Sequence, residues 1–174
     1  MNFINFYKKN VIQYDLINKF LYTNPSSLPK IKKINIHFVF KQPNITNTLT
    51  TLTALNLISL QKGTLIKAKK PNITLKIRQG NPVGCTVTLR RVKQDRFLNK
   101  LLNDIFNGKY AINYDTSFRH LIFSFNIKST LLFNELKQNY RFFSKLPDLR
   151  INVFTTAKTK HEFKFLIKSY KIIN

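Results

Sequence analysis

Short segments of the chain alternate apolar and polar residues, a pattern typical of a β-strand with one buried face. Residues 34–41 show it most regularly, with Ile34, Ile36, Phe38 and Phe40 on one side and Asn35, His37, Val39 and Lys41 on the other. Comparable alternation predicts strands at 65–69, 73–78, 85–90, 123–127 and 149–153. In 73–78 and 85–90 we expect the apolar residues inside and the hydroxyl or cationic residues outside.

Residues 3–21 keep apolar side chains three to four positions apart, which predicts a helix with one apolar face. We expect that face to consist of Phe3, Tyr7, Val11, Tyr14, Ile17 and Leu21. The segment lacks a small-residue cleavage site and contains Asp15. An amphipathic helix over 1–22 is therefore favoured over a signal or transit peptide.

Three further helices are expected. The stretch 46–60 predicts one despite its many threonines, and 94–106 predicts another that Gly108 would end. The last helix would begin at a capping box formed by Thr159 and Glu162.

The segment 131–143 fits either a helix or a loop. Strands are grouped between helices without strict alternation, and no linker or internal repeat interrupts them. This order predicts a single α+β domain over residues 1–174, with a mostly antiparallel sheet and helices packed on one of its faces.

The charge balance constrains the partner. Thirty Lys and Arg against seven Asp and Glu give a formal net charge of +23 at pH 7, although 43% of the residues are hydrophobic. A folded chain this basic repels itself unless a polyanion neutralises it. Nucleic acid is the commonest polyanion, and an anionic membrane surface is the alternative. The longest uncharged stretch, 42–61, could span a bilayer by length but is too polar to remain in one.

The sequence contains no constellation that predicts catalysis, a cofactor or a metal site. The carboxylates are scattered, and His37, His120 and His161 share no ligand spacing with one another or with Cys85. We expect the histidines to be exposed or to face RNA, and the single cysteine to be a small buried hydrophobe. The stretch 80–86 lacks the spacing and the lysine of a phosphate-binding P-loop.

Two of the four glycines, Gly80 and Gly84, fall between the predicted strands 73–78 and 85–90. A hairpin turn explains them, because glycine adopts positive φ freely and Pro82 would stiffen the connection. A compatible second interpretation is that the glycines let the backbone approach a phosphate chain. The flanking cations support it, and these are Lys76, Arg78, Arg90 and Arg91.

The stretch KIRQGNPVGCTVTLR, residues 76–90, resembles the signature of the large-subunit ribosomal protein five family, the universal ribosomal proteins that bind 5S rRNA. Other segments extend the resemblance over most of the chain. The opening helix and first strand of the family are similar to YKKNV (7–11), Phe20, Tyr22, Asn24 and PKIKKI (29–34). Its segment before the hairpin is similar to ISLQK (58–62) and KAKK (67–70), and its last strand end to TTAK (155–158).

This resemblance implies a concave sheet that holds 5S rRNA in the central protuberance, without catalysis and without a cofactor. Carried over by position, the rRNA-binding residues are Lys30, Lys33, His37, Gln61, Lys62, Thr88 and Arg90. A protruding basic loop over 70–84 would contact peptidyl-site tRNA through Lys69, Lys70, Asn72, Lys76, Arg78, Gln79, Gly80 and Asn81. The other implied partners are large-subunit rRNA, neighbouring large-subunit proteins and, through an intersubunit bridge, a protein of the small-subunit head.

The chain departs from the family pattern at several places. His37 stands where family members usually carry Asn, and residues 39–41 replace a glycine-rich turn. The region 109–139 is shorter and lacks the usual arginine- and glycine-rich insertion, and its FNEL (133–136) only partly matches the family's FPEI. Contacts of that region are therefore not carried over.

Lys, Asn, Ile and Phe are abundant and can all be encoded with A and T alone, which favours an AT-rich genome such as an organelle's. The family's start aligns close to Met1, so we expect synthesis inside the organelle. The mitochondrial matrix ranks above the plastid, and no membrane partner is expected. The rival interpretations are a cationic membrane-surface protein using the N-terminal helix and a general RNA-binding protein outside the ribosome, with an enzyme third.

Overall fold

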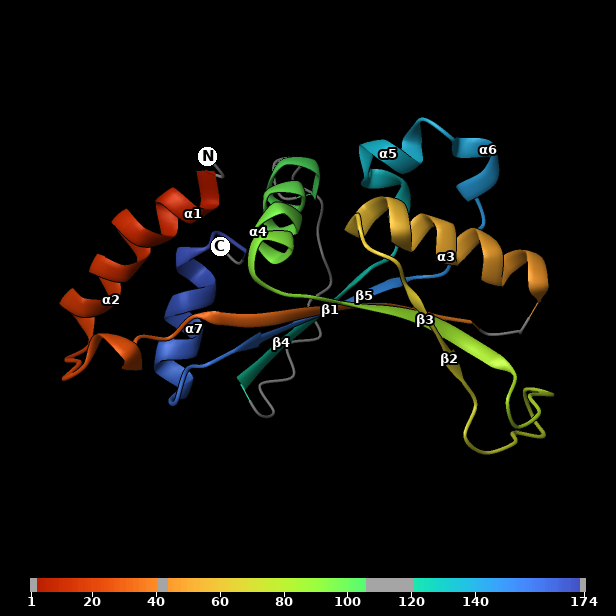
Figure 1. Ribbon diagram of the computed structural model, residues 1–174, viewed down its shortest axis with the longest axis horizontal. Coiled ribbons are helices and arrows are strands. Elements are labelled where there is room, and N and C mark those ends of the chain that lie inside the picture. Colours follow the sequence, from red (N-terminus) through yellow and green to blue (C-terminus); the bar gives the residue numbers. More distant parts are fainter. Residues whose placement is uncertain (1–2, 41–43, 106–120, 173–174) are drawn as a thin grey trace.

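A five-stranded sheet organises the computed structural model, which describes residues 3–40, 44–105 and 121–172 (Figure 1). Its strands are β1 (Ile31–Val39), β2 (Thr64–Lys67), β3 (Pro82–Leu89), β4 (Ile122–Ile127) and β5 (Leu149–Thr155). They lie in the order β2-β3-β1-β5-β4, and every pairing is antiparallel. The predicted α+β class with a mostly antiparallel sheet is confirmed.

The helices fall between the strands as predicted. An N-terminal helix runs through α1 (Phe3–Tyr7), the π-helical turn η1 (Lys8–Ile12) and α2 (Gln13–Lys19), and the 3-10 turn η2 (Pro25–Ser27) follows. Next come α3 (Ile45–Ser59), α4 (Arg91–Lys100) and its π-helical continuation η3 (Leu101–Ile105). The ambiguous segment 131–143 forms short helices, and the remaining elements are η6 (Thr130–Leu132), α5 (Asn134–Lys137), α6 (Tyr140–Phe143) and α7 (Lys160–Ser169). The expected helix end at Gly108 lies outside the described residues.

One face of the sheet is buried against helices. The buried strand residues alternate along each strand, and they are Ile34, Ile36, Phe38, Cys85, Val87, Leu89, Phe123, Phe125, Ile127, Leu149, Ile151 and Val153. Leu55 of α3 and Phe97 of α4 belong to the same apolar cluster, and Figure 1 shows both helices on one side of the sheet. The intervening residues therefore point to the opposite side. We call that side the open face, because no described helix lies across it (Figure 1).

The last helix begins at the predicted capping box. Thr159 Oγ1 accepts a hydrogen bond from the Glu162 backbone N–H at 3.2 Å, and Glu162 Oε2 accepts one from the Thr159 backbone N–H at 3.3 Å. Phe165 of this helix packs edge-on against Phe20, with ring centroids 5.8 Å apart. The contact holds the N-terminal segment beside α7 at one end of the sheet (Figure 1).

The predicted buried face of the N-terminal helix is wrong. Ile4, Ile12 and Leu16 are buried, whereas Phe3 is 70% exposed and Tyr14 is 61% exposed. The other residues expected inside, Val11, Ile17 and Leu21, are exposed as well, and Tyr7 is half-buried. The π-helical turn explains the difference, because its wider turn moves later residues around the axis, so that a spacing of four rather than 3.6 stays on one face.

The predicted strand at 73–78 is also wrong. Ile73 is 92% exposed and Leu75 is 48% exposed, and the only pairing of this segment is an isolated bridge between Asn72 and Ile77. Asn72 Oδ1 accepts hydrogen bonds from the Thr74 hydroxyl at 2.6 Å and from the Leu75 N–H at 3.3 Å. This side-chain turn competes with the strand ladder for the same backbone groups.

The two glycines near the hairpin serve different purposes. Gly80 lies in the turn with φ +86° and has open space around it. Gly84 instead lies inside β3, where a Cβ would clash with the Phe38 carbonyl oxygen on β1. Pro82 is the first residue of β3. The protruding segment is therefore residues 68–81, here called the basic loop, and not 70–84 as predicted.

Replacing Gly84 with Ala is expected to separate β1 from β3, because the new methyl group meets rigid backbone. We expect a loss of about 1–3 kcal/mol in the free energy of unfolding and faster hydrogen exchange at the Phe38 and Cys85 amides. Gly80→Ala is the control, since its cost is confined to the loop conformation. Equal protection of the β1–β3 amides in both variants would contradict the assignment.

Candidate nucleic-acid interface

The open face presents two rows of polar side chains, each with one residue from four neighbouring strands. The first row is Thr88, Asn35, Asn152 and Ser124, and the second is Thr86, His37, Arg150 and Asn126. Arg150 is exposed and the others are half-buried. Hydroxyl, amide, imidazole and guanidinium groups together offer both donors and acceptors on one surface.

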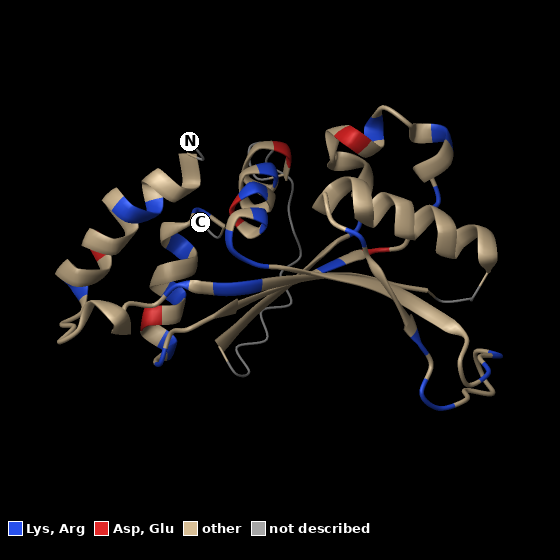
Figure 2. Ribbon diagram, in the orientation of Figure 1, with Lys and Arg blue, Asp and Glu red and all other residues tan. Residues whose placement is uncertain are grey.

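The electrostatics of this face suit a polyanion. None of the five strands contains Asp or Glu, and the sequence has no acidic residue between Asp15 and Asp95. Figure 2 shows the acidic residues on helices and connecting segments, and basic residues on the strands and the basic loop. Lys33 Nζ lies 4.5 Å from the centroid of the Phe154 ring on the neighbouring strand, an arrangement that holds the ammonium group against the open face.

The structure brings most of the sequence-predicted rRNA-binding residues together. Lys33, His37 and Thr88 lie on the open face, and the extended backbone of Arg90 directs this residue outward just after β3. Gln61 and Lys62 follow α3 at the sheet edge, where Gln61 Nε2 lies 3.5 Å from the Thr88 carbonyl oxygen. Lys30 stands apart, just before β1, where its backbone hydrogen-bonds with Thr156.

Sequence reasoning missed an amide pair at the centre of this face. Asn35 and Asn152 are directly opposite across β1 and β5. Their Oδ1 atoms are both buried, and neither accepts a hydrogen bond from any described residue. An unpaired buried acceptor is costly, so the pair favours a donor that comes from outside the chain. The alternation of 34–41 placed Asn35 outward, but nothing in the sequence indicated that β5 would lie beside β1.

His37 is a neutral member of the second row. Burial lowers its pKa from the ordinary value, and the adjacent positive charge of Arg150 lowers it further. The imidazole is therefore neutral at pH 7, with one nitrogen donating and the other accepting. The Asn usual in the resembling family has the same donor and acceptor character.

The basic loop projects from the end of the β2–β3 pair (Figure 1). At its base the Ala68 N–H donates to the Asn81 carbonyl oxygen at 2.8 Å, and the Gly80 N–H donates to the Ala68 carbonyl oxygen at 3.0 Å. The sequence-predicted residues that it exposes are Lys69, Lys70, Asn72, Lys76, Arg78, Gln79 and Gly80, while Asn81 is half-buried. Asn72 folds the tip with its amide oxygen, so only its amide nitrogen is left for a ligand.

Other chemistry finds little support in the described part of the chain. It contains no group of three or more His, Cys, Asp or Glu that could hold a metal ion. Cys85 is buried in the core as predicted, and burial raises the pKa of its thiol to about 11. His161 is exposed on α7 as expected, and His120 lies outside the described residues.

Known proteins resemble this chain over nearly its whole length. A family model that describes the C-terminus of the uL5 family of ribosomal proteins matches residues 82–173. The large ribosomal subunit protein uL5m of Reclinomonas americana is 34% identical over 180 residues, which cover 99% of this chain and 97% of that protein.

Two bacterial relatives agree with this match. The large ribosomal subunit protein uL5 of Nitrosomonas eutropha is 36% identical over 171 residues, covering 94% of this chain and 93% of that protein. The uL5 of Geobacter sulfurreducens is 34% identical over 170 residues, covering 93% of this chain and 92% of that protein.

Proposed function

The chain belongs to the uL5 family of ribosomal proteins and is a structural component of the large ribosomal subunit rather than an enzyme, and from this premise we propose that its open face binds 5S rRNA. The observation that carries the proposal is the acid-free surface centred on Asn35 and Asn152, whose amide oxygens lack donors among the described residues. Ribose 2′-hydroxyl groups and base amino groups supply such donors when folded RNA lies against a sheet.

Two kinds of contact divide the work on this face. Thr88, His37 and Gln61 form short polar contacts that fix the position of the RNA. Lys30, Lys33, Lys62 and Arg90 neutralise phosphates along the face and its margin. The polar contacts give register, and the cations give affinity through counterion release.

The basic loop is the part of the chain that contacts peptidyl-site tRNA in this proposal. Its exposed cations stand away from the sheet (Figure 2), so they remain accessible when RNA occupies the open face. Its base is tied by backbone hydrogen bonds between Ala68 and the segment 80–81. Contacts between cations and phosphates need no base sequence, which suits a partner that changes at every elongation cycle.

The remaining partners follow from the same placement. In the central protuberance, the helical side would face large-subunit rRNA and neighbouring large-subunit proteins, and the rim would bridge to a protein of the small-subunit head. We place the particle in the mitochondrial matrix rather than in a plastid. The AT-biased composition and the similarity to the mitochondrial uL5m of Reclinomonas americana support this location.

One observation favours a second candidate, a cationic membrane-surface protein. The N-terminal helix exposes Phe3, Phe6, Tyr14 and Ile17 beside its lysines. Among the described helices none has the length and hydropathy to cross a bilayer. Flotation with anionic liposomes in moderate salt would support that candidate, whereas sedimentation of the protein with large subunits supports the ribosomal one.

Removing charge at the sheet margin tests the 5S rRNA proposal. The double variant Lys62→Gln, Arg90→Gln is expected to bind 5S rRNA more weakly and to reduce the slope of log affinity against log salt by about one to two. The matched control, Lys137→Gln with Arg141→Gln, removes two exposed charges from α5 and α6 on the covered side of the sheet. Equal slopes in the two variants would refute the assignment.

Removing charge from the basic loop tests the division between rRNA and tRNA. Lys76→Gln with Arg78→Gln is expected to leave incorporation into the large subunit unchanged, because the open face is intact. Retention of peptidyl-site tRNA by the assembled particle should weaken, measured by filter binding of labelled tRNA at increasing salt. Failure of the variant to enter the subunit would show that the loop is needed for assembly instead.

A further inference from the structure

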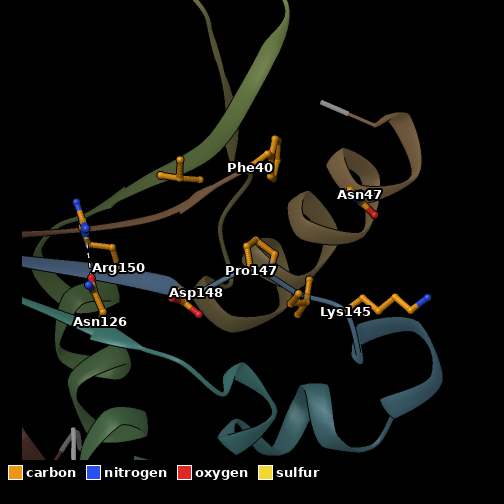
Figure 3. A pocket seen from close by; sticks show the side chains of 9 residues that line it. Phe40, Asn47, Asn126, Lys145, Pro147, Asp148 and Arg150 are labelled. Atoms are coloured by element: carbon orange, nitrogen blue, oxygen red, sulfur yellow. Dashed lines mark hydrogen bonds between the residues drawn. The ribbon is translucent and has the colours of Figure 1, made fainter. Parts of the chain in front are cut away.

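An open pocket lies at one end of the open face, where β1 ends and β5 begins (Figure 3). Its volume is about 770 Å³, within the range of about 300–1,000 Å³ typical of small-ligand sites. The lining residues are Val39, Phe40, Asn47, Asn126, Lys145, Leu146, Pro147, Asp148 and Arg150. Val39 and Phe40 belong to the segment that replaces the family's glycine-rich turn, so the pocket is partly built from a departure of this chain.

The walls of this pocket combine flat apolar surface with fixed polar groups. Phe40 and Pro147 face the same space in Figure 3, beside Val39 and Leu146, and together they offer contact area for a planar ring. Arg150 is oriented by a hydrogen bond from its Nε to Asn126 Oδ1 at 2.9 Å. Because Nε is engaged, the two terminal nitrogens of the guanidinium group remain for an anion.

Asp148 is the single carboxylate among the lining residues, and it is exposed. Within the described part of the chain it forms no ion pair with Arg150 or Lys145, although both line the same pocket. A carboxylate is acceptor-only and can receive two parallel hydrogen bonds. Among the four RNA bases, guanine presents two adjacent donors on its Watson–Crick edge, N1–H and N2–H, and adenine, cytosine and uracil present one each.

We propose that this pocket holds one unstacked guanosine of the bound RNA. The base lies against the apolar walls, Asp148 accepts its N1–H and N2–H, and Arg150 and Lys145 face the adjoining phosphate. The inference rests on the proposed function, because Arg150 and Asn126 also belong to the second polar row of the open face. RNA lying on that row therefore passes the mouth of the pocket, and splayed bases are a usual target of sequence-specific RNA recognition.

Labelled heptanucleotides with six uridines and one central purine test the proposal by fluorescence anisotropy on the full chain. The central guanosine oligomer is expected to bind about tenfold more tightly than the adenosine oligomer. Inosine, which lacks the 2-amino group, should fall between them. Equal affinities for guanosine and adenosine would overturn the proposal.

Asp148→Asn provides the decisive variant, because its two expected effects have opposite signs. Removing a negative charge would tighten all RNA binding if the carboxylate only repelled phosphate, whereas the proposal requires loss of the guanosine preference. Asp15→Asn makes the same change in charge on the exposed side of α2 and should keep the preference. A uniform gain in affinity for Asp148→Asn would contradict the assignment.

Binding of 5S rRNA in the same preparations separates this proposal from the function on which it rests. If 5S rRNA binds and the oligomers show no guanosine preference, the pocket assignment fails and the open-face assignment stands. If 5S rRNA does not bind, the open-face assignment fails. Saturation by free GMP without competition from the guanosine oligomer would mean a mononucleotide site, which also overturns the proposal.

Discussion

The pairing of β1 with β3 on one side and β5 on the other is the constraint on which the rest of the structure depends. It aligns three strands so that their apolar residues meet α3 and α4 while their polar residues form continuous rows. A shift of one residue in either pairing would exchange the two faces. Gly84 protects this register, because only a residue without Cβ fits beside the Phe38 carbonyl oxygen.

The open face is incomplete in the free protein. Asn35 and Asn152 hold buried amide oxygens without donors from the described residues, and the strands carry positive charge with no acidic residue to balance it. Both features cost stability in isolation and are relieved when a polyanion with hydrogen-bond donors covers the face. The same physics explains why a chain with a net charge of +23 can keep a well-packed core.

Much of this arrangement could be predicted from the sequence, because strand alternation and capping are local. The inward set of β1, the buried Cys85 and the capping box at Thr159 all follow from a few neighbouring residues. The rRNA-binding residues came from a resemblance rather than from spacing, and the structure places most of them at one surface. Contacts set by distant segments were out of reach, since the pairing of β5 with β1, which brings Arg150 beside His37, leaves no local mark.

The errors have physical causes as well. The π-helical turn at Lys8–Ile12 rotated the N-terminal helix away from the face predicted by a regular period. The side chain of Asn72 turned an apparently alternating strand into a loop tip. In both cases a local backbone choice overrode the hydrophobic pattern, and in both the displaced apolar residues became exposed.

The most direct measurement compares stability and RNA affinity in the double variant Asn35→Leu, Asn152→Leu. Leucine is close to asparagine in shape, so removing two unpaired acceptors should leave the free energy of unfolding in urea unchanged or raise it. Affinity for 5S rRNA should nevertheless fall by about tenfold or more, since two hydrogen bonds to RNA are lost. Unchanged affinity for 5S rRNA, or a fall in stability that accounts for the loss of binding, would contradict the account.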